Sequence, residues 1–134
     1  MPNGSLIYAS YAKGFASGGF NNDDRVSAFP AETADNYEIG TKGTYLDGKL
    51  QVNANVFLFD YINNQRSVAR IDPNSGAASI ATVPIQKAEV DGYEIEIKAF
   101  INDYFSVLAS RGAYGGKYIE FVDDNGNDLT GYAY

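Results

Sequence analysis

The chain has 134 residues, which is enough for one domain with its own core. Its 11 tyrosines, 8 phenylalanines and 14 glycines favour strands and turns over helices. Cysteine and histidine are both absent, which excludes disulfides, Ser-His-Asp and Cys-His triads and most zinc sites. The net charge of −7 argues against nucleic acid as a partner, because phosphate binding needs a surplus of lysine and arginine.

No run of about 18 apolar residues is present, so we expect no transmembrane helix. The membrane stays open as a location, because the strands of a membrane barrel alternate and give only a weak signal segment by segment. The first five residues lead almost directly into a predicted strand and show neither a basic nor an apolar leader region. We therefore expect no signal peptide in this chain.

Two strands and a long polar connection are predicted in the first part of the chain. The first strand runs from about Leu6 to Phe15, and a glycine-rich loop follows over residues 16–33. The second strand runs from about Asp35 to Tyr45 with a period of two. One face carries Tyr37, Ile39, Thr41, Gly43 and Tyr45, and the other carries Asn36, Glu38, Gly40, Lys42 and Thr44. This alternation predicts a sheet with one apolar and one polar face.

A tight hairpin turn is expected at residues 46–48, because Asp47-Gly48 tolerates the positive φ that such turns need. The third strand then runs from Lys49 to about Arg70. Its apolar face carries Leu50, Val52, Ala54, Val56 and Leu58, opposite Lys49, Gln51, Asn53 and Asn55. This strand is longer than the ten or so residues that cross a bilayer.

A polar loop over residues 71–79 separates the third strand from the fourth, which is predicted from about Ile80 to Ile101. The fourth strand's apolar face carries Tyr93, Ile95, Ile97, Ala99 and Ile101, opposite Gly92, Glu94, Glu96 and Lys98. A short turn at Asn102-Asp103 leads to the fifth strand, Tyr104 to about Gly115. The chain ends in a polar stretch that contains residues 120–130.

The pattern predicts an all-β chain, an antiparallel meander of about five long strands whose connections alternate between long and short. Outer-membrane barrels follow this rule, whereas a soluble β-sandwich module, such as an adhesin or a carbohydrate-binding domain, shares the strand alternation. Two features favour the barrel. The polar faces are rich in Asn, Gln, Glu and Lys, and aromatic residues stand near predicted strand ends, namely Tyr37, Tyr45, Tyr104 and Phe105.

An ordered series of motifs carries a family resemblance over nearly the whole chain. The series comprises Tyr8 to Phe15, Pro30 and Glu32, Tyr37 to Gly43, Phe57 with Asp60, Tyr61 and Gln65, Ala88 with Gly92 to Glu96, and Asp128 to Gly131. In this order the motifs resemble the β-barrel of TonB-dependent outer-membrane receptors. The resemblance implies a barrel of about 22 strands around a plug domain. Residues 1–134 would be part of that barrel, without the plug.

The resemblance also implies a function for the intact protein. It would be an outer-membrane receptor of a Gram-negative bacterium for siderophore-bound iron, cobalamin or oligosaccharides. It would be energised through TonB by way of the plug region, and it would not be an enzyme. Its partners would be outer-membrane lipid, the TonB complex and a nutrient ligand. The isolated chain is expected to form an open twisted sheet or a sheet-packed dimer, because unpaired edges and an apolar face favour self-association.

Arg66 and Arg70 are the candidate ligand-binding residues, because both lie towards the outer end of the third predicted strand and could contact an anionic ferric siderophore. Arg111 has the same chemistry. The alternative is that all three are lumen charges paired with Glu or Asp. We predict no catalytic residue, no cofactor and no metal ligand.

Three other groups have a weaker claim to a site. The glycines at 14, 18 and 19 lack the Gly-Lys-Ser/Thr of a phosphate loop. Glu94 and Glu96, with Glu89 and Asp91 nearby, suggest a glycosidase pair, but a charged lumen face explains them better. The acidic and amide cluster at residues 123–128 could bind calcium, but it does not fit the EF-hand spacing, and an Asx-rich turn is the better account.

Overall fold

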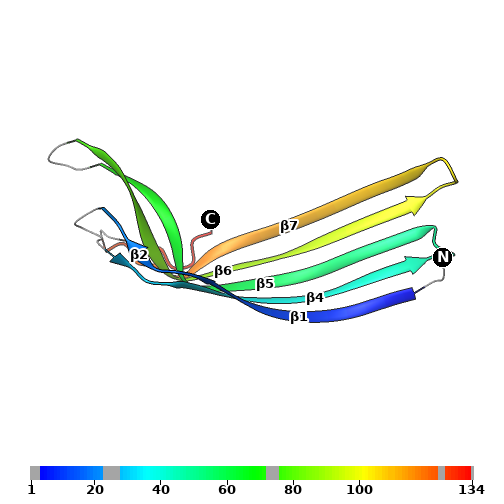
Figure 1. Ribbon diagram of the computed structural model, residues 1–134, viewed down its shortest axis with the longest axis horizontal. Helices are drawn as coiled ribbons and strands as arrows, with labels where there is room; N and C mark the ends of the chain where they lie inside the picture. Colours follow the sequence, from blue (N-terminus) through cyan, green and yellow to red (C-terminus); the bar gives the residue numbers. More distant parts are fainter. Residues whose placement is uncertain (1–3, 23–27, 72–75, 124–125, 134) are drawn as a thin grey trace. The chain divides into compact units, whose positions relative to one another are not determined.

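In the computed structural model, which describes residues 4–22, 28–71, 76–123 and 126–133, the chain is all-β. Five long strands form one open antiparallel sheet in the order β1-β4-β5-β6-β7 (Figure 1). They are β1 (Gly4–Ala16), β4 (Glu32–Tyr45), β5 (Leu50–Ile71), β6 (Ala78–Phe100) and β7 (Ser106–Glu120). A separate two-stranded sheet pairs β2 (Gly19–Phe20) with β3 (Ala28–Phe29). The predicted five-stranded meander is confirmed.

No helix in the described part of the chain is long and apolar enough to span a membrane. The long sheet has β1 and β7 as its edge strands and is not closed. The expectation of an open sheet is therefore confirmed, whereas self-association of the isolated chain stays a prediction.

Two predicted boundaries were wrong, both at the ends with long connections. The predicted loop over residues 16–33 contains the β2–β3 hairpin, and β4 begins at Glu32 instead of Asp35. The fifth strand, β7, continues to Glu120 instead of ending near Gly115. Cross-strand contacts extend the pairing there, because Lys13 forms an ion pair with Asp35 at 3.4 Å and Lys117 forms one with Glu89 at 2.6 Å. The periodicity of one strand does not reveal such partners.

The β4–β5 turn confirms the predicted hairpin but contains an unexpected residue. The backbone N–H of Gly48 donates to the carbonyl of Tyr45 at 3.1 Å, and Leu46, Asp47 and Gly48 all have positive φ, at 52°, 54° and 91°. Asp and Gly suit these angles, but leucine rarely adopts them, because its Cβ comes too close to the neighbouring carbonyl oxygen. The turn is therefore strained at Leu46.

Replacing Leu46 by asparagine is expected to stabilise the sheet by about 1 kcal/mol, because asparagine tolerates the left-handed region. The measurement is the free energy of unfolding in urea, with the parent protein and the Leu46→Asn variant refolded into the same detergent micelles. Leu50→Asn serves as the control and should destabilise, since Leu50 lies within β5 where no positive φ is required. Equal losses in the two variants would contradict the strain at position 46.

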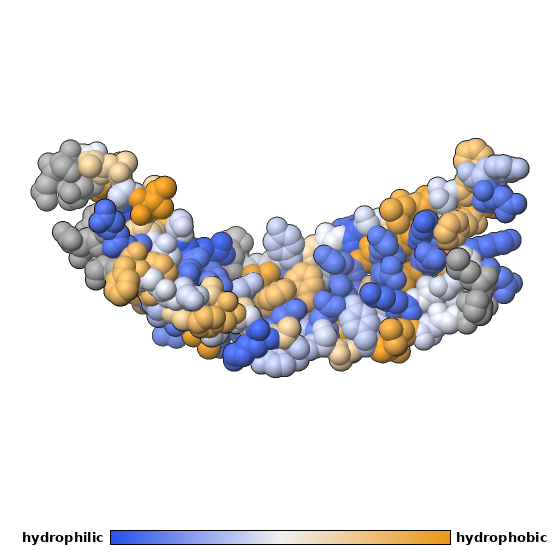
Figure 2. Space-filling model, in the orientation of Figure 1, coloured by the Kyte–Doolittle hydropathy of each residue, from blue (hydrophilic) through white to orange (hydrophobic). Residues whose placement is uncertain are grey.

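The chain divides into two compact units, which are described separately. The first comprises Met1–Ala12, Asn36–Phe59 and Val90–Gly115. Its apolar side chains are exposed instead of buried under a second layer; for example, Ile39 is 53% and Val56 52% exposed. Figure 2 shows hydrophobic side chains lying open among hydrophilic ones on one face of the molecule. A soluble sandwich would cover such side chains with a second sheet.

Glycines of the first unit accommodate aromatic rings on the polar side of the sheet. A Cβ added at Gly40 would lie 2.6 Å from the ring of Tyr8, and one at Gly92 would lie 2.6 Å from the ring of Phe57. Each glycine belongs to a predicted strand motif, Tyr37 to Gly43 or Gly92 to Glu96. Gly40 and Gly92 therefore make room for rings from the neighbouring strands.

The second unit comprises Lys13–Asp35, Asp60–Glu89 and Gly116–Tyr134. Its buried hydrophobic residues all lie on β6, and they are Ala81, Val83, Ile85 and Ala88. Ala81, Val83 and Ile85 share one face by alternation, as expected for a strand covered on one side. Over its described residues, the second unit thus has a small apolar core on β6.

Candidate functional site

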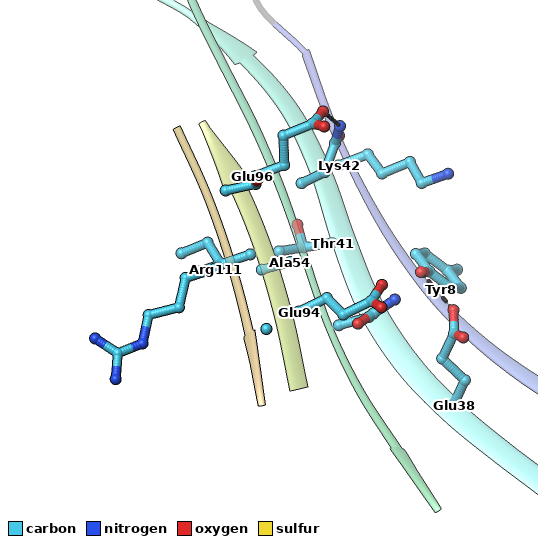
Figure 3. A pocket seen from close by; sticks show the side chains of 13 residues that line it. Tyr8, Glu38, Thr41, Lys42, Ala54, Glu94, Glu96 and Arg111 are labelled. Atoms are coloured by element: carbon cyan, nitrogen blue, oxygen red, sulfur yellow. Dashed lines mark hydrogen bonds between the residues drawn. The ribbon is translucent and has the colours of Figure 1, made fainter. Parts of the chain in front are cut away.

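The polar face of the first unit forms an open groove of about 520 Å³ across five strands (Figure 3). The predicted polar-face residues Glu38, Lys42, Asn53, Glu94 and Glu96 all contribute to its lining. The other lining residues are Tyr8, Thr41, Ala54, Asn55, Ile95, Ser110, Arg111 and Gly112. The alternation predicted for β4, β5 and β6 is therefore confirmed in this part of the sheet.

Hydrogen bonds between neighbouring strands order the groove. The Tyr8 hydroxyl donates to Glu38 Oε1 at 2.6 Å, and Asn53 Nδ2 donates to Glu96 Oε1 at 3.2 Å. The ammonium group of Lys42 lies 5.6 Å from the centre of the Tyr8 ring, within the range of a cation–π interaction. The groove thus presents three carboxylates and one lysine on an open polar surface, which suits a polar partner.

Arg111 behaves differently from the charged residues of the groove. Figure 3 shows its side chain directed away from the side chains of Glu94 and Tyr8. A Cβ added at Gly112 would lie 3.5 Å from Glu94 Cγ, so Gly112 occupies the groove face. Arg111 borders the groove, but its side chain extends from the opposite face of β7. Arg111 belongs to the first unit, whereas Arg66 and Arg70 belong to the second.

Glu94 and Glu96 lie on one strand and both are exposed, in keeping with a charged wall. A general acid usually lies in an apolar environment, whereas both of these carboxylates are exposed to solvent. Glu89, which was considered with them, instead pairs with Lys117 at 2.6 Å. The described geometry therefore favours the lumen-wall account over the glycosidase pair.

In the second unit, Arg66 and Arg70 lie in the last third of β5, towards its connection with β6. Arg66 is exposed, and its Nε donates to Asn64 Oδ1 at 2.8 Å. Asn64 itself is only 8% exposed, so this contact holds the guanidinium close to the strand. A ligand-binding role for Arg66 and Arg70 stays a prediction.

Residues that sequence reasoning did not single out as site residues tie the β1–β4 connection to β5 and β6. Gln65 donates from its side chain to two carbonyls of that connection, and Asn21 forms two hydrogen bonds with the backbone of Thr82. Gln65 belongs to the family motif formed with Phe57, Asp60 and Tyr61. Membership of this motif was the feature of the sequence that could have identified Gln65. Asn21 carried no comparable signal, because a lone asparagine in a polar loop is common.

The polar stretch after β7 is an Asx-rich turn over its described residues. Both carboxylate oxygens of Asp123 accept from Asn127, at 2.8 and 2.9 Å. Hydrogen bonds from the hydroxyl and the backbone N–H of Thr130 hold the pKa of Asp128 below its ordinary value. Asp124 and Asn125 lie outside the described residues, and among the described ones no three carboxylates gather as a metal site would require.

Comparison with known proteins agrees with this geometry. The family model "TonB dependent receptor-like, beta-barrel" matches residues 1–134. The chain is 28% identical to the ferric-pyoverdine 358 receptor of Pseudomonas putida over 130 residues, which is 97% of this chain and 15% of that protein. It thus spans about 15% of that relative's length.

Two solved structures have a similar fold. One is the pyoverdine outer membrane receptor FpvA of Pseudomonas aeruginosa PAO1, bound to pyoverdine. The match covers 93% of this chain and 18% of the FpvA chain, with a TM-score of 0.58 and 28% sequence identity. The alcaligin outer membrane receptor FauA of Bordetella pertussis matches 95% of this chain and 21% of its own, with a TM-score of 0.55 and 25% identity. With the family model matched from the first residue to the last, the chain belongs to the β-barrel family of TonB-dependent receptors.

Proposed function

We propose that the chain forms five neighbouring strands in the barrel of an outer-membrane receptor that takes up ferric siderophores with energy from TonB. The observation that carries this proposal is the full-length family match, on a sheet with one exposed apolar face and one polar groove. The relatives named for pyoverdine and alcaligin favour a ferric siderophore over cobalamin or an oligosaccharide.

The spacing of aromatic residues supports a lipid-facing band on the first unit. Tyr37 and Tyr45 share a face of β4 and are eight residues apart, which corresponds to about 27 Å along a strand. Outer-membrane barrels have an apolar band about 25 Å tall between two aromatic girdles. The ring of Tyr11 lies 5.2 Å from that of Tyr37 and strengthens this edge of the band. Tyr37 is the sixth residue of β4, so it marks a membrane boundary and not the end of the strand.

The strand lengths support the same orientation. β5 has 22 and β6 has 23 residues, about twice the 9–11 that cross a bilayer. The short turns at residues 46–49 and 101–105 would face the periplasm, and the long connections would face the outside. Under this proposal Arg66 and Arg70 lie towards the extracellular end of β5, where a ligand arrives.

The test is an uptake assay with the full-length receptor that contains this chain, expressed in a Gram-negative strain without its own siderophore receptors. Cells supplied with radioactive ferric pyoverdine or ferric alcaligin should accumulate iron, and deletion of TonB should abolish the accumulation. Uptake of labelled cobalamin or an oligosaccharide, with no iron uptake, would overturn the ligand class. A receptor that assembles in the outer membrane and carries none of these ligands would overturn the transport proposal.

A further inference from the structure

One side chain, Gln65 of β5, joins the two described arms of the β1–β4 connection, which are residues 17–22 and 28–31. Its Nε2 donates to the carbonyl of Ser17 at 3.0 Å and to the carbonyl of Pro30 at 3.1 Å. A glutamine amide has two N–H donors, so both are used. Ser17 and Pro30 are 13 positions apart in the chain, and the same side-chain nitrogen donates hydrogen bonds to the carbonyl groups of both.

Neighbouring residues fix the position of Gln65 itself. Its backbone N–H donates to Glu32 Oε2 at 2.7 Å, a short bond to a charged acceptor. Asn63 Nδ2 donates to the carbonyl of Ala31 at 3.3 Å, next to the Pro30 contact. Asn63 also has a φ of 56° inside β5, which interrupts the regular alternation of the strand. The position of Gln65 is therefore fixed by its place in β5 and by its hydrogen bond with Glu32 at the start of β4.

The two arms also touch each other and β6. A Cβ added at Gly18 would lie 2.6 Å from the carbonyl oxygen of Phe29 and 2.9 Å from the backbone nitrogen of Ala31, so only glycine permits this approach. Beyond it, Asn21 Nδ2 donates to the Thr82 carbonyl at 2.7 Å and the Thr82 N–H donates to Asn21 Oδ1 at 2.8 Å. The first arm is thereby attached to β6, and Gln65 attaches both arms to β5.

We propose that Gln65 is a positioning residue for ligand capture: it holds the two arms of the β1–β4 connection against β5, so that the arms are ordered before an anionic metal chelate binds. The proposal rests on the proposed receptor function. Arms that are ordered in advance lose less conformational entropy when the ligand binds. If the arms are ordered in only a fraction of the receptor molecules, the apparent affinity falls by that fraction. Gln65 acts through the arms and does not itself contact the ligand.

The experiment uses the full-length receptor with any cysteines outside this chain removed, since the chain has none of its own. A spin label on Phe20→Cys reports the motion of the first arm, because Phe20 is 88% exposed and described within β2. Gln65→Leu removes both donors and should make this label clearly more mobile. A label on Ile80→Cys, which is 77% exposed on β6, should keep its mobility.

Binding and uptake of ferric pyoverdine by unlabelled receptor give the second readout. Gln65→Leu should weaken the apparent affinity about tenfold, as expected for the loss of two hydrogen bonds. The maximal uptake rate at saturating ligand should be unchanged, because an occupied receptor has already ordered the arms. A loss of maximal rate without a loss of affinity would overturn the positioning role.

Two further variants keep the proposal falsifiable if Gln65→Leu assembles poorly. Gly18→Ala separates the arms without touching Gln65 and should mobilise the Phe20→Cys label in the same way. Gln51→Leu, the same change elsewhere on β5, is the control and should alter neither the label nor the affinity. An immobile label in both Gln65→Leu and Gly18→Ala would overturn the proposal. The label reports the motion of the first arm whether or not pyoverdine binds. A receptor without siderophore affinity would therefore refute the proposed function, but not the ordering of the arms by Gln65.

Discussion

Replacing Gly92 by alanine is expected to destabilise the sheet by about 1–3 kcal/mol, because the new Cβ overpacks a full site. That Cβ would lie 2.6 Å from Phe57 Cζ, 2.7 Å from the Ala113 carbonyl oxygen and 2.8 Å from Tyr114 Cβ. The Phe57 ring can rotate, but the carbonyl belongs to the backbone of β7 and moves only if the strands separate. Alanine is better than glycine in a strand by about 0.5–1 kcal/mol, so the contacts decide the sign.

Gly115→Ala is the matched control for this prediction. Gly115 lies in the neighbouring strand, and a Cβ added there meets nothing within 4 Å. This variant should gain the strand preference of alanine and be as stable as the parent or slightly more stable. Free energies of unfolding in urea, together with the fraction of receptor assembled in the outer membrane, provide the comparison. If the two alanine variants are equally stable, the close packing around Gly92 is not as described.

Replacing Ile39 by arginine is expected to cost about 2 kcal/mol of stability in a bilayer. Ile39 is 53% exposed on the apolar face of β4, two residues inside the proposed lipid-facing band that begins at Tyr37. An arginine there would have to leave water for lipid or direct its long side chain to the membrane surface. The measurement is the yield of folded receptor in lipid vesicles and its unfolding in urea.

Asn53→Arg places the same charge on the opposite face, in the groove beside Glu96. It should cost little, because Glu96 is exposed to solvent and supplies an opposite charge. Equal tolerance of Ile39→Arg and Asn53→Arg would contradict a lipid-facing role for the apolar face. A parent chain that remains monomeric in buffer without detergent would contradict it as well.

Sequence periodicity predicted the strands of the first unit and the sides on which their residues lie. A strand has a repeat of two whatever it packs against, so the alternation from Tyr37 to Tyr45 and from Gly92 to Ile101 could be read directly. The Asp47-Gly48 turn was readable for a similarly local reason, since its backbone angles exclude most residue pairs. The family resemblance, carried by motifs from Tyr8 to Gly131, then identified the kind of sheet.

The second unit was harder to predict because distant residues form it. The early start of β4 and the extension of β7 occur beside partners far away in the chain, as with Lys13 and Asp35 or Lys117 and Glu89. The β2–β3 hairpin pairs only two residues on each strand, too few for a readable period. Arg66 and Arg70 were selected for their charge and for their place towards the outer end of a predicted strand, and neither criterion shows what their side chains contact. The contacts of Gln65 with Ser17 and Pro30 span 48 and 35 positions, and no local pattern shows them.

The sequence by itself determined an antiparallel chain of about five strands with one apolar and one polar face, and its motifs placed it among receptor barrels. These properties follow from local rules of strand and turn geometry. Only the tertiary structure decided which glycines accommodate aromatic rings, where Arg111 points and how Gln65 joins two arms of a connection. Each of these depends on the register between strands, and register is set by pairing over long separations in the chain.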